Sequence, residues 1–554
     1  MIIKLAIILL FYAGLHTGLW KLFEKAKYKG WYSLVPIYDL IIWLKIIKKP
    51  WWWLLILMIP GVNIILFLVM LYNLAEAFGK ETAGERALAM FAFPVILPMW
   101  GFDKHVKFLG MDTNRKRSSG EQWIDAIVFA VIAATIIRTF FIEAFQIPTS
   151  SMEKSLMVGD YLFVSKVSYG ARSPMTPLTV PFTHSTLPGG NVQSYLEWLT
   201  LPYFRLPGLG SIERGDVVVF NFPEGDSVAV NAPNGTYYQY IRQAGYELNM
   251  RDSVMSKKPL PVLDNIGRQY VSDHPEIYGK IVYRPVDKRD HYVKRCVGLP
   301  GDKLQIVNDT LVINDKREAF PANAELHYSI TNNRSGNNVL REMGTTNEDF
   351  KYYRSGAGLP IPFRQLGDYK KLLTTSGPIK MNPEFDRSIL PHDTSLAKWT
   401  VQNFGPIHIP KEGETVTLDK MNLAMYKRCI TAYEGNTLEE KDGKIFINGQ
   451  PATTYTFKQD YYFMMGDNRH GSLDSRFWGF VPNDHIVGKP VMVWMSMDPD
   501  KKFPLNIRWN RLVSFVGIDG VSRSYGIHFL ILLALIIGLN TLYKRGTFSF
   551  LRRK

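Results

Sequence analysis

The distribution of apolar residues along the chain restricts its fold more than any other feature of the sequence. Residues 2–20 and 51–75 approach or exceed the roughly 20 apolar residues that a helix needs to cross a bilayer. Residues 123–142 and 527–543 have the same character, and residues 87–102 form a shorter stretch interrupted by two prolines. We therefore predict five membrane spans, four before a long polar middle and one after it.

Basic residues beside these stretches predict the orientation of the chain. The connection 21–50 holds seven lysines, residues 103–122 and 544–554 each hold five basic residues, and the connection 76–86 holds two. An excess of Lys and Arg marks the cytoplasmic side. The pattern predicts that the N-terminus and residues 146–526 lie outside the cytoplasm. The first stretch lacks a small-x-small cleavage site, so we interpret it as an anchor rather than a signal peptide.

The net charge of +15 would by itself suggest nucleic-acid binding. The basic clusters lie beside apolar stretches, however, where they orient a membrane protein and meet anionic lipid. We therefore expect a phospholipid bilayer as a partner, and no nucleic acid. Cys296 and Cys429 are too few for a disulfide framework or an all-cysteine metal site, and the sequence leaves open whether they pair. Because the sequence has no H-E-x-x-H, Walker or dinucleotide-binding motif, we expect no metal and no cofactor.

The polar middle shows the alternation of apolar and polar residues that is typical of strands. Four segments bounded by Gly, Pro, Asn and Asp have this pattern: residues 161–170, 215–223, 291–301 and 489–497. In residues 304–316 and 439–450, an Asn-Asp or Asp-Gly pair separates alternating runs, which predicts two β-hairpins.

The chain between these hairpins is polar and turn-rich, which favours a second domain inserted into the first. The predicted fold is a mostly-β exported domain with an inserted second domain, anchored by several transmembrane α-helices. Its predicted parts are a membrane module of about three spans (1–122), an anchor (123–143), a β-rich core (146–305 and 455–500), the insert (306–454), a C-terminal span (527–543) and a basic cytoplasmic tail (544–554).

Four segments carry a more specific signal. They are FQIPTSSMEKSLMVGDYLFV at 145–164, GDVVVFNFP at 215–223, YVKRCVGLPGDKL at 292–304 and MMGDNRHGSLDSRFWGFVP at 464–482. In this order they resemble the conserved boxes of bacterial signal peptidase I, a membrane-anchored Ser/Lys protease family. The resemblance covers the exported core and does not include the N-terminal apolar stretches, the insert or the last span.

By this resemblance, Ser151 is the catalytic nucleophile and Lys294 the general base. Serine is a weak nucleophile without a base in hydrogen-bond reach, and lysine can serve as that base only when it is neutral. Lys294 lies in an alternating, strand-like segment among Tyr292, Val293 and Cys296, where burial would lower its pKa. The residues themselves thus favour the same chemistry as the resemblance.

The resemblance also implies supporting roles. Thr149 falls where the family carries an oxyanion-hole hydroxyl, beside the backbone N–H of Ser151. Ser472 falls at a serine that helps to orient the lysine, and Asp474 and Arg476 fall at a charged pair that braces the site. His470 stands where the family often has an acidic residue, which makes the local electrostatics differ.

The implied activity is that of a hydrolase, a serine endopeptidase that removes signal peptides during protein secretion. Its substrates would be secretory preproteins whose cleavage site ends in a small-x-small pattern. We expect a multi-pass protein of the cytoplasmic (inner) membrane, with its catalytic domain on the periplasmic or outer side. The secretion translocon is a further partner to consider.

Two other catalytic arrangements and one non-enzymatic function are compatible with parts of the sequence. Ser151 and Lys154 spell the S-x-x-K signature of penicillin-binding proteins and serine β-lactamases, but K-T-G and S-D-N partner motifs are absent. A Ser-His-Asp triad could use His291 or His470 with Asp467. An envelope scaffold with an inactive core would be the non-enzyme alternative, although every matched catalytic position is filled.

Overall fold

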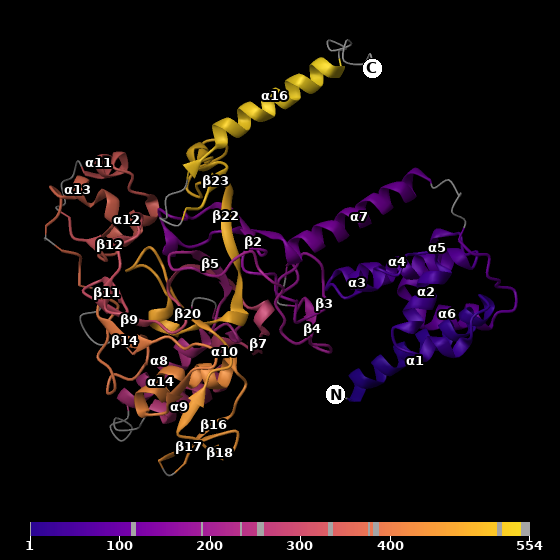
Figure 1. Cartoon of the computed structure of the whole chain (residues 1–554), viewed down its shortest axis with the longest axis horizontal. Helices are drawn as coiled ribbons and strands as arrows, with labels where there is room; N and C mark the ends of the chain where they lie inside the picture. Colours follow the sequence, from indigo (N-terminus) through magenta and orange to yellow (C-terminus); the bar gives the residue numbers. More distant parts are fainter. Residues whose placement is uncertain are drawn as a thin grey trace. The chain divides into compact units, whose positions relative to one another are not determined.

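The computed structural model of the chain forms two compact units (Figure 1). One comprises Met1–Thr139 with Pro174–Tyr203, and the other Phe140–Ser173 with Phe204–Lys554. The structure describes residues 2–111, 118–189, 192–232, 235–251, 260–330, 336–374, 377–380, 387–441, 443–517 and 523–544.

The first unit is helical. Its helices are α1 (Ile2–Lys25), α2 (Tyr38–Ile46), α3 (Trp53–Leu57), α4 (Val62–Ala77), α5 (Ala83–Phe91), α6 (Phe93–Phe102) and most of α7 (Ser119–Phe140). Buried side chains such as Leu22, Trp43 and Leu71 form its hydrophobic core. The segment Pro174–Tyr203 also belongs to this unit, and within it two short strands pair, β3 (Leu178–Thr179) and β4 (Tyr195–Leu196).

The prediction of five spans is not confirmed. Among the helices whose side chains the structure describes throughout, α7 is the one long and apolar enough to cross a membrane, with 22 residues; the side chains of residues 2–8 in α1 lie outside this description. Helices α4 and α6 and the described apolar part of α16 (Gly526–Lys544) are shorter. The stretch 51–75, predicted as one span, is two helices, because the chain turns at Pro60 and Gly61, where Gly61 has φ 77°.

The second unit is built on a nine-stranded antiparallel sheet. The main strand order is β1-β2-β22-β5-β8-β20-β21, and β23 and β24 extend it from β22. These strands are β1 (Ile142–Gln146), β2 (Asp160–Ser165), β5 (Val217–Asn221), β8 (His291–Gly298), β20 (Tyr461–Met465), β21 (Val481–Pro482), β22 (Ile486–Ser496), β23 (Ser514–Phe515) and β24 (Arg523–Ser524). The four alternating segments of the sequence all contribute strands to this sheet, so the mostly-β prediction is confirmed.

A second, four-stranded sheet has the order β11-β10-β9-β14. Its strands are β9 (Lys303–Val307), β10 (Thr310–Ile313), β11 (Lys316–Arg317) and β14 (Phe404–His408). Asn308 and Asp309 join β9 to β10 with φ 46° and 65°, as a tight hairpin turn requires. The first predicted hairpin is therefore confirmed. In the second, β16 (Leu438–Lys441) pairs with β17 (Lys444–Ile447), and Asp442 of its turn lies outside the described residues.

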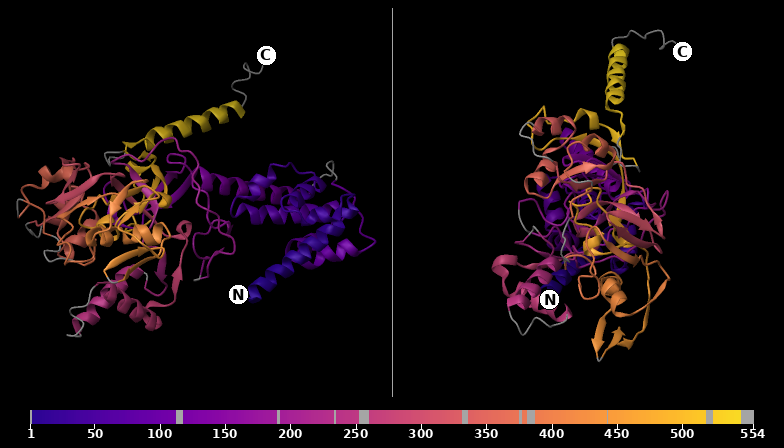
Figure 2. Two further views of the ribbon diagram at one scale, coloured as in Figure 1. Left: turned by 60° about the horizontal axis from the view of Figure 1, so that its bottom comes forward. Right: turned by 90° about the vertical axis from the view of Figure 1, so that its left-hand side faces the viewer.

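The remaining elements surround these sheets. Helices α8 (Tyr237–Arg251) and α9 (Leu260–Asp273) pack as a helical hairpin that stands away from the large sheet (Figure 2). Strands β12 (Glu325–Tyr328) and β13 (Leu359–Pro362) pair beside α11 (Gly336–Glu342), α12 (Asn347–Arg354) and α13 (Leu366–Tyr369). Ile306, Phe404 and Ile430 of the predicted insert share a hydrophobic core with Phe463 of β20.

Candidate active site

Ser151 lies in a tight turn between strands β1 and β2. It belongs to a short 3₁₀ helix, Ser150–Met152, and its side chain is largely buried. The neighbouring Met152 is fully buried in an apolar cluster with Ile147 and Leu156. The backbone N–H of Asn468 donates to the carbonyl of Ser151 at 3.1 Å. The apolar anchor and this hydrogen bond fix the turn that presents the hydroxyl.

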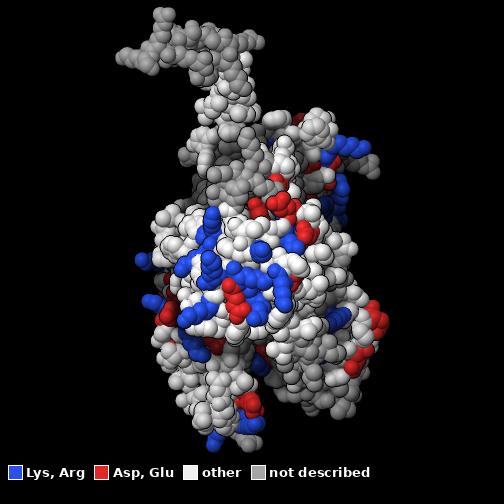
Figure 3. Space-filling model, turned by 90° about the vertical axis from the view of Figure 1, so that its right-hand side faces the viewer, with Lys and Arg blue, Asp and Glu red and all other residues white. Residues whose placement is uncertain are grey.

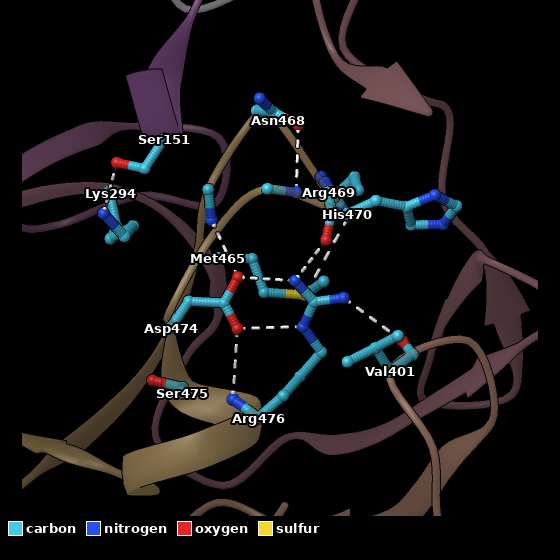
Figure 4. Close-up of polar contacts among 12 residues, drawn as sticks. Ser151, Lys294, Val401, Met465, Asn468, Arg469, His470, Asp474, Ser475 and Arg476 are labelled. Carbon is cyan, nitrogen blue, oxygen red and sulfur yellow. Dashed lines mark hydrogen bonds and ion pairs between the residues drawn. The ribbon is translucent and has the colours of Figure 1, made fainter. Parts of the chain in front are cut away.

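Lys294 projects from the middle of strand β8, which pairs with β5 through Val218. Its side chain is 2% exposed. Its Nζ donates to Ser151 Oγ at 2.7 Å (Figure 4). It also donates to the carbonyl of Val293 at 3.1 Å. The structure thus brings the predicted nucleophile and the predicted base into direct contact, although 143 positions separate them in the sequence.

Burial changes the proton affinity of this lysine. Desolvation lowers the pKa of Lys294 from 10.5 to about 8, against the opposing attraction of Asp474 and Asp467. Both carboxylates are engaged by arginines: Asp474 by Arg476, and Asp467 by Arg295. The lysine consequently has no carboxylate of its own among the described residues, and a neutral amine is accessible near physiological pH.

Asp474 and Arg476 form a buried bidentate ion pair beside the dyad. The Nε and Nη2 atoms of Arg476 donate to Asp474 at 2.8 and 2.7 Å, and the Gly466 N–H donates to the same carboxylate at 3.1 Å (Figure 4). Arg476 also donates to the carbonyl oxygens of Arg469 and Val401, at 2.6 and 3.2 Å. The pair therefore ties together three segments around the site.

A second buried ion pair, between Arg295 and Asp467, was not predicted from the sequence. Arg295 donates to Asp467 at 2.8 and 2.6 Å and to the carbonyl of Gly215 at 2.6 Å. Ser155 donates its hydroxyl to Asp467 at 2.5 Å. Arg295 directly follows the catalytic lysine candidate on β8, so its side chain points to the opposite face of the strand. A second charged residue directly after Lys294 in a buried strand was the signal that could have indicated this pair.

The structure does not assemble a Ser-His-Asp triad from the described residues. Asp467, the proposed acid, is paired with Arg295. His470 contacts Asp309 at 2.9 Å and accepts a hydrogen bond from the His327 N–H. His291 packs its ring on Phe145, with the centroids 4.8 Å apart.

Lys154 of the S-x-x-K pattern points away from Ser151. The residue has φ 65°, which breaks the helical spacing that would bring it back to the serine. Its Nζ donates to Asp349 at 2.6 Å and to the carbonyl of Gly344 at 2.9 Å. Burial acts to lower the pKa of Lys154, but the attraction of Asp349 and Glu325 outweighs it and raises that pKa above 10.5. Lys154 is therefore a charged partner of Asp349 and not a base for the serine.

Among the described residues, neither Thr149 nor Ser472 forms a hydrogen bond with Ser151 or Lys294. Thr149 is exposed beside the nucleophile. Ser472 is buried, and its Oγ has no hydrogen-bond partner within the described part of the chain. A Cβ added to Gly466 would lie 2.2 Å from Ser472 Oγ and 2.6 Å from the Ser151 carbonyl. Only glycine lets Ser472 approach the nucleophile turn, a requirement that the sequence did not reveal. The roles of Thr149 and Ser472 remain predictions.

Comparison with known proteins agrees with this geometry. A family model described as signal peptidase, peptidase S26, matches residues 120–360 and 452–495, just over half of the chain. The chain belongs to this signal peptidase family. The match includes the nucleophile turn, strand β8 and the loop that carries Asp474 and Arg476. Residues 31–111, in the helical unit, match a separate family of unknown function, DUF5684.

Curated relatives in the signal peptidase family cover most of the chain. A protein named signal peptidase I from Buchnera aphidicola subsp. Schizaphis graminum is 25% identical over 378 residues, which are 68% of this chain and 76% of the relative. A signal peptidase I from Haemophilus influenzae is 23% identical over 403 residues, 72% of this chain and 76% of the relative.

Two further observations concern bound groups and thiols. Among the described residues, no group of three His, Cys, Asp or Glu side chains could hold a metal ion. Cys296 and Cys429 are both buried free thiols. Cys296 and Cys429 therefore do not form a disulfide with each other in this structure.

Proposed function

We propose that this signal peptidase cleaves peptide bonds with Ser151 as nucleophile and Lys294 as general base. One observation carries the proposal: the Nζ of a buried lysine lies 2.7 Å from the hydroxyl oxygen of a serine in a fixed turn. The lowered pKa of Lys294, about 8, supports it, because a neutral amine can accept the serine proton.

The reaction follows the ordinary course of covalent catalysis. Neutral Lys294 removes the proton of the Ser151 hydroxyl while Oγ attacks the carbonyl carbon of the scissile bond. The protonated lysine then gives its proton to the leaving amine, and an acyl-enzyme ester remains on Ser151. Lys294 next takes a proton from water, which attacks the ester and releases the new carboxyl end. Ser151 recovers its proton from the lysine.

The negative oxygen of each tetrahedral intermediate needs hydrogen-bond donors. We assign this task to the backbone N–H of Ser151 and the hydroxyl of Thr149. The exposure of Thr149 beside the nucleophile supports the assignment, since an arriving substrate would meet its hydroxyl. Ser472 we assign to orienting Lys294, supported by its burial and its unpartnered hydroxyl. Asp474 and Arg476 brace the loop that carries it.

The substrates we assign are secretory preproteins with N-terminal signal peptides, as the names of the relatives indicate. A membrane location suits such substrates, because their apolar segment is still in the bilayer when the cleavage site is presented. Helix α7 ends at Phe140, close in sequence to Ser151. A short tether of this kind favours cleavage near the outer membrane surface, with the bilayer and the secretion translocon as partners.

We further propose a multi-pass protein of the cytoplasmic membrane with its catalytic unit on the outer side. Helix α1, with 24 residues, is long enough to cross with α7, and α16 would return the basic tail 544–554 to the cytoplasm. Residues 1–122 act as a membrane module, and residues 306–454 as a domain inserted into the β-rich core. The excess of Lys and Arg beside the apolar stretches supports this orientation.

Preprotein cleavage by three variants tests the mechanism. Ser151→Ala and Lys294→Ala should each abolish cleavage while membrane insertion and expression stay normal, since the two residues act as a unit. Ser150→Ala is the matched control: its hydroxyl contacts Tyr352 at 3.2 Å rather than the base, and cleavage should persist. Near-normal turnover by the Lys294 variant would exclude the Ser/Lys mechanism. Full cleavage by both variants would show that cleavage does not depend on Ser151 and Lys294.

A further inference from the structure

Both ends of the stretch predicted as the second span are held by the same short segment. Before the stretch, Lys48 Nζ donates to the carbonyl of Met111 at 2.9 Å. At its end, the N–H groups of Leu109 and Gly110 donate to the carbonyl of Ala77, at 3.0 and 3.1 Å. A segment that crossed the bilayer would separate its ends by about 30 Å. These contacts instead bring both ends to residues 109–111.

The path between these ends is a turn within the helical unit. Helix α3 runs to Leu57, the chain reverses at Gly61, and α4 returns over 16 residues, about 24 Å. Near the reversal, Asn63 Nδ2 donates to the carbonyl of Pro177 at 3.3 Å, and a Cβ built on Gly61 would lie 3.6 Å from Pro181. The irregular backbone of the turn is thus covered by protein, as backbone at membrane depth must be.

The stretch 83–102 also has both of its ends on one side of the helical unit, and its helices are shorter than α4. Helices α5 and α6 have 9 and 10 residues, about 14 and 15 Å, and neither could cross alone. Lys80, before α5, lies over the ring of Trp100, near the end of α6, at 5.3 Å. The rings of Phe78 and Phe108 pack with their centroids 5.4 Å apart and their planes tilted by 57°. Both ends of this stretch therefore lie beside residues 100–110.

The packing of α6 on α1 shows how deep the second stretch reaches. A Cβ on Gly14 would lie 2.2 Å from the carbonyl oxygen of Pro94, and one on Gly101 would lie 2.7 Å from Lys21 Cβ. The two helices therefore run parallel, and α6 begins about halfway along α1. The junction of α5 and α6 at Ala92 lies at that depth, not at the far end of α1.

The ends of these segments meet on a basic face. Lys25, at the end of α1, donates to the carbonyl oxygens of Trp100 and Val106 at 3.0 and 2.9 Å, which joins residues 21–50 to 103–111. The exposed lysines of these two connections are Lys27, Lys29, Lys45, Lys48, Lys104 and Lys107. Figure 3 shows Lys and Arg side chains gathered on one face of the molecule, with few Asp or Glu among them.

We propose that residues 51–77 and 83–102 are two re-entrant segments that enter and leave the bilayer on this basic face. The connection 78–82 then lies in the cytoplasm with 26–50 and 103–111, and the face rests on the anionic headgroups of the inner leaflet. Five spans would instead place 78–82 outside. Only α1 and α7 cross the membrane before the catalytic unit. The start of α1 and the end of α7 therefore both lie outside the cytoplasm.

Labelling with a membrane-impermeant maleimide distinguishes the two topologies. The two native cysteines are buried and give a low background. Glu81→Cys reports on the connection 78–82, where Glu81 is exposed. Lys29→Cys is the cytoplasmic control, and Glu412→Cys, at an exposed position of the catalytic unit, is the external control. Each full-length variant is labelled in intact spheroplasts and again after lysis, and its preprotein cleavage is measured.

The re-entrant arrangement predicts that Glu81→Cys behaves like Lys29→Cys, with labelling only after lysis. Labelling in intact spheroplasts, as for Glu412→Cys, would overturn it and establish five spans. No labelling under either condition would also overturn it, because the connection would then be buried in the bilayer. The inference rests on the proposed orientation of the catalytic unit. Protection of Glu412→Cys in intact spheroplasts would show that the orientation itself is wrong.

Discussion

Replacing Lys294 by Met should abolish cleavage and at the same time stabilise the protein at neutral pH. The reason lies in the cost of burying a lysine that is 2% exposed and has no carboxylate of its own. Desolvation lowers the pKa of Lys294 from 10.5 to about 8 in the folded protein. In the unfolded chain the lysine is solvated and keeps its ordinary pKa.

The sign of the effect follows from proton binding. Between pH 8 and pH 10.5 the unfolded chain holds a proton on Lys294 that the folded protein has lost, so the free energy of unfolding rises with pH across this window. Below the window both states are protonated, and the folded protein carries the full penalty. At about 1.4 kcal/mol per pKa unit, that penalty is about 3 kcal/mol.

Methionine removes the charge and keeps a side chain of similar length. The substitution loses the hydrogen bond from Lys294 Nζ to Ser151 Oγ, which is worth about 1 kcal/mol. The net expectation at pH 7 is therefore a gain of about 2 kcal/mol in the free energy of unfolding. Above pH 10.5 the lysine is neutral in both states, the penalty vanishes, and the variant should lose its advantage.

Unfolding of the detergent-solubilised protein, followed from pH 7 to pH 11, measures this difference. Ser151→Ala is the matched control, since it is also inactive but keeps Lys294, and its pH dependence should follow the wild type. A Lys294→Met variant that is less stable at pH 7, or that differs from wild type by the same amount at both ends of the range, would refute the reasoning. Lys294 would then not be a desolvated amine.

Three further single substitutions and one double variant test the surroundings of the dyad. Thr149→Val should lower kcat by about 100-fold with little change in KM, because the backbone donor of Ser151 remains in the oxyanion hole; loss as complete as in Ser151→Ala would contradict that division. Asp349→Asn should cost about 3 kcal/mol in urea unfolding, because it leaves the buried Lys154 cation without its partner at 2.6 Å. Adding Lys154→Met should recover most of that stability, and equal losses in the single and double variants would exclude the ion pair as the cause. Gly466→Ala should impair cleavage in a protein that still folds, as judged by circular dichroism, because its Cβ would lie 2.6 Å from the Ser151 carbonyl; unchanged activity would show that the turn can move without loss.

The strands of the catalytic sheet were predictable because they alternate apolar and polar residues over short, bounded runs. The segment that became β8 carries Lys294 among apolar neighbours, and its burial followed from that pattern. The hairpin at Asn308 and Asp309 was predictable for a similar reason, since the turn requires positive φ at both positions. In these cases, residues close together in the sequence determine the local structure.

Contacts between distant segments were not predictable in this way. Lys154 meets Asp349 across 195 positions of the chain, and the sequence around either residue does not indicate the other. Asp467 was considered as the acid of a triad, but its partner proved to be Arg295. A carboxylate in a Gly-rich loop pairs with the cation that the folded chain places beside it. Residues distant in the sequence determine which cation that is.

The membrane module shows the limit of hydropathy. Residues 51–75 are apolar enough to cross a bilayer, yet the turn at Gly61 divides them into α3 and α4. Composition measures the preference of a segment for lipid and does not determine whether its ends lie on one side or on two. The hydrogen bonds of Lys48 and Ala77 to residues 109–111 provide that information, and they exist only in the folded unit.

The pH dependence of kcat/KM for preprotein cleavage tests the central claim most directly, because it reports the protonation state of the free enzyme. If Lys294 acts as a neutral base with its pKa lowered to about 8, kcat/KM should rise about tenfold per pH unit below pH 8 and level off above it. The rate at pH 6 should then be about one hundredth of the plateau. A rate that is flat from pH 6 to pH 9, or that levels off near pH 6 as for a histidine base, would contradict the Ser151–Lys294 mechanism.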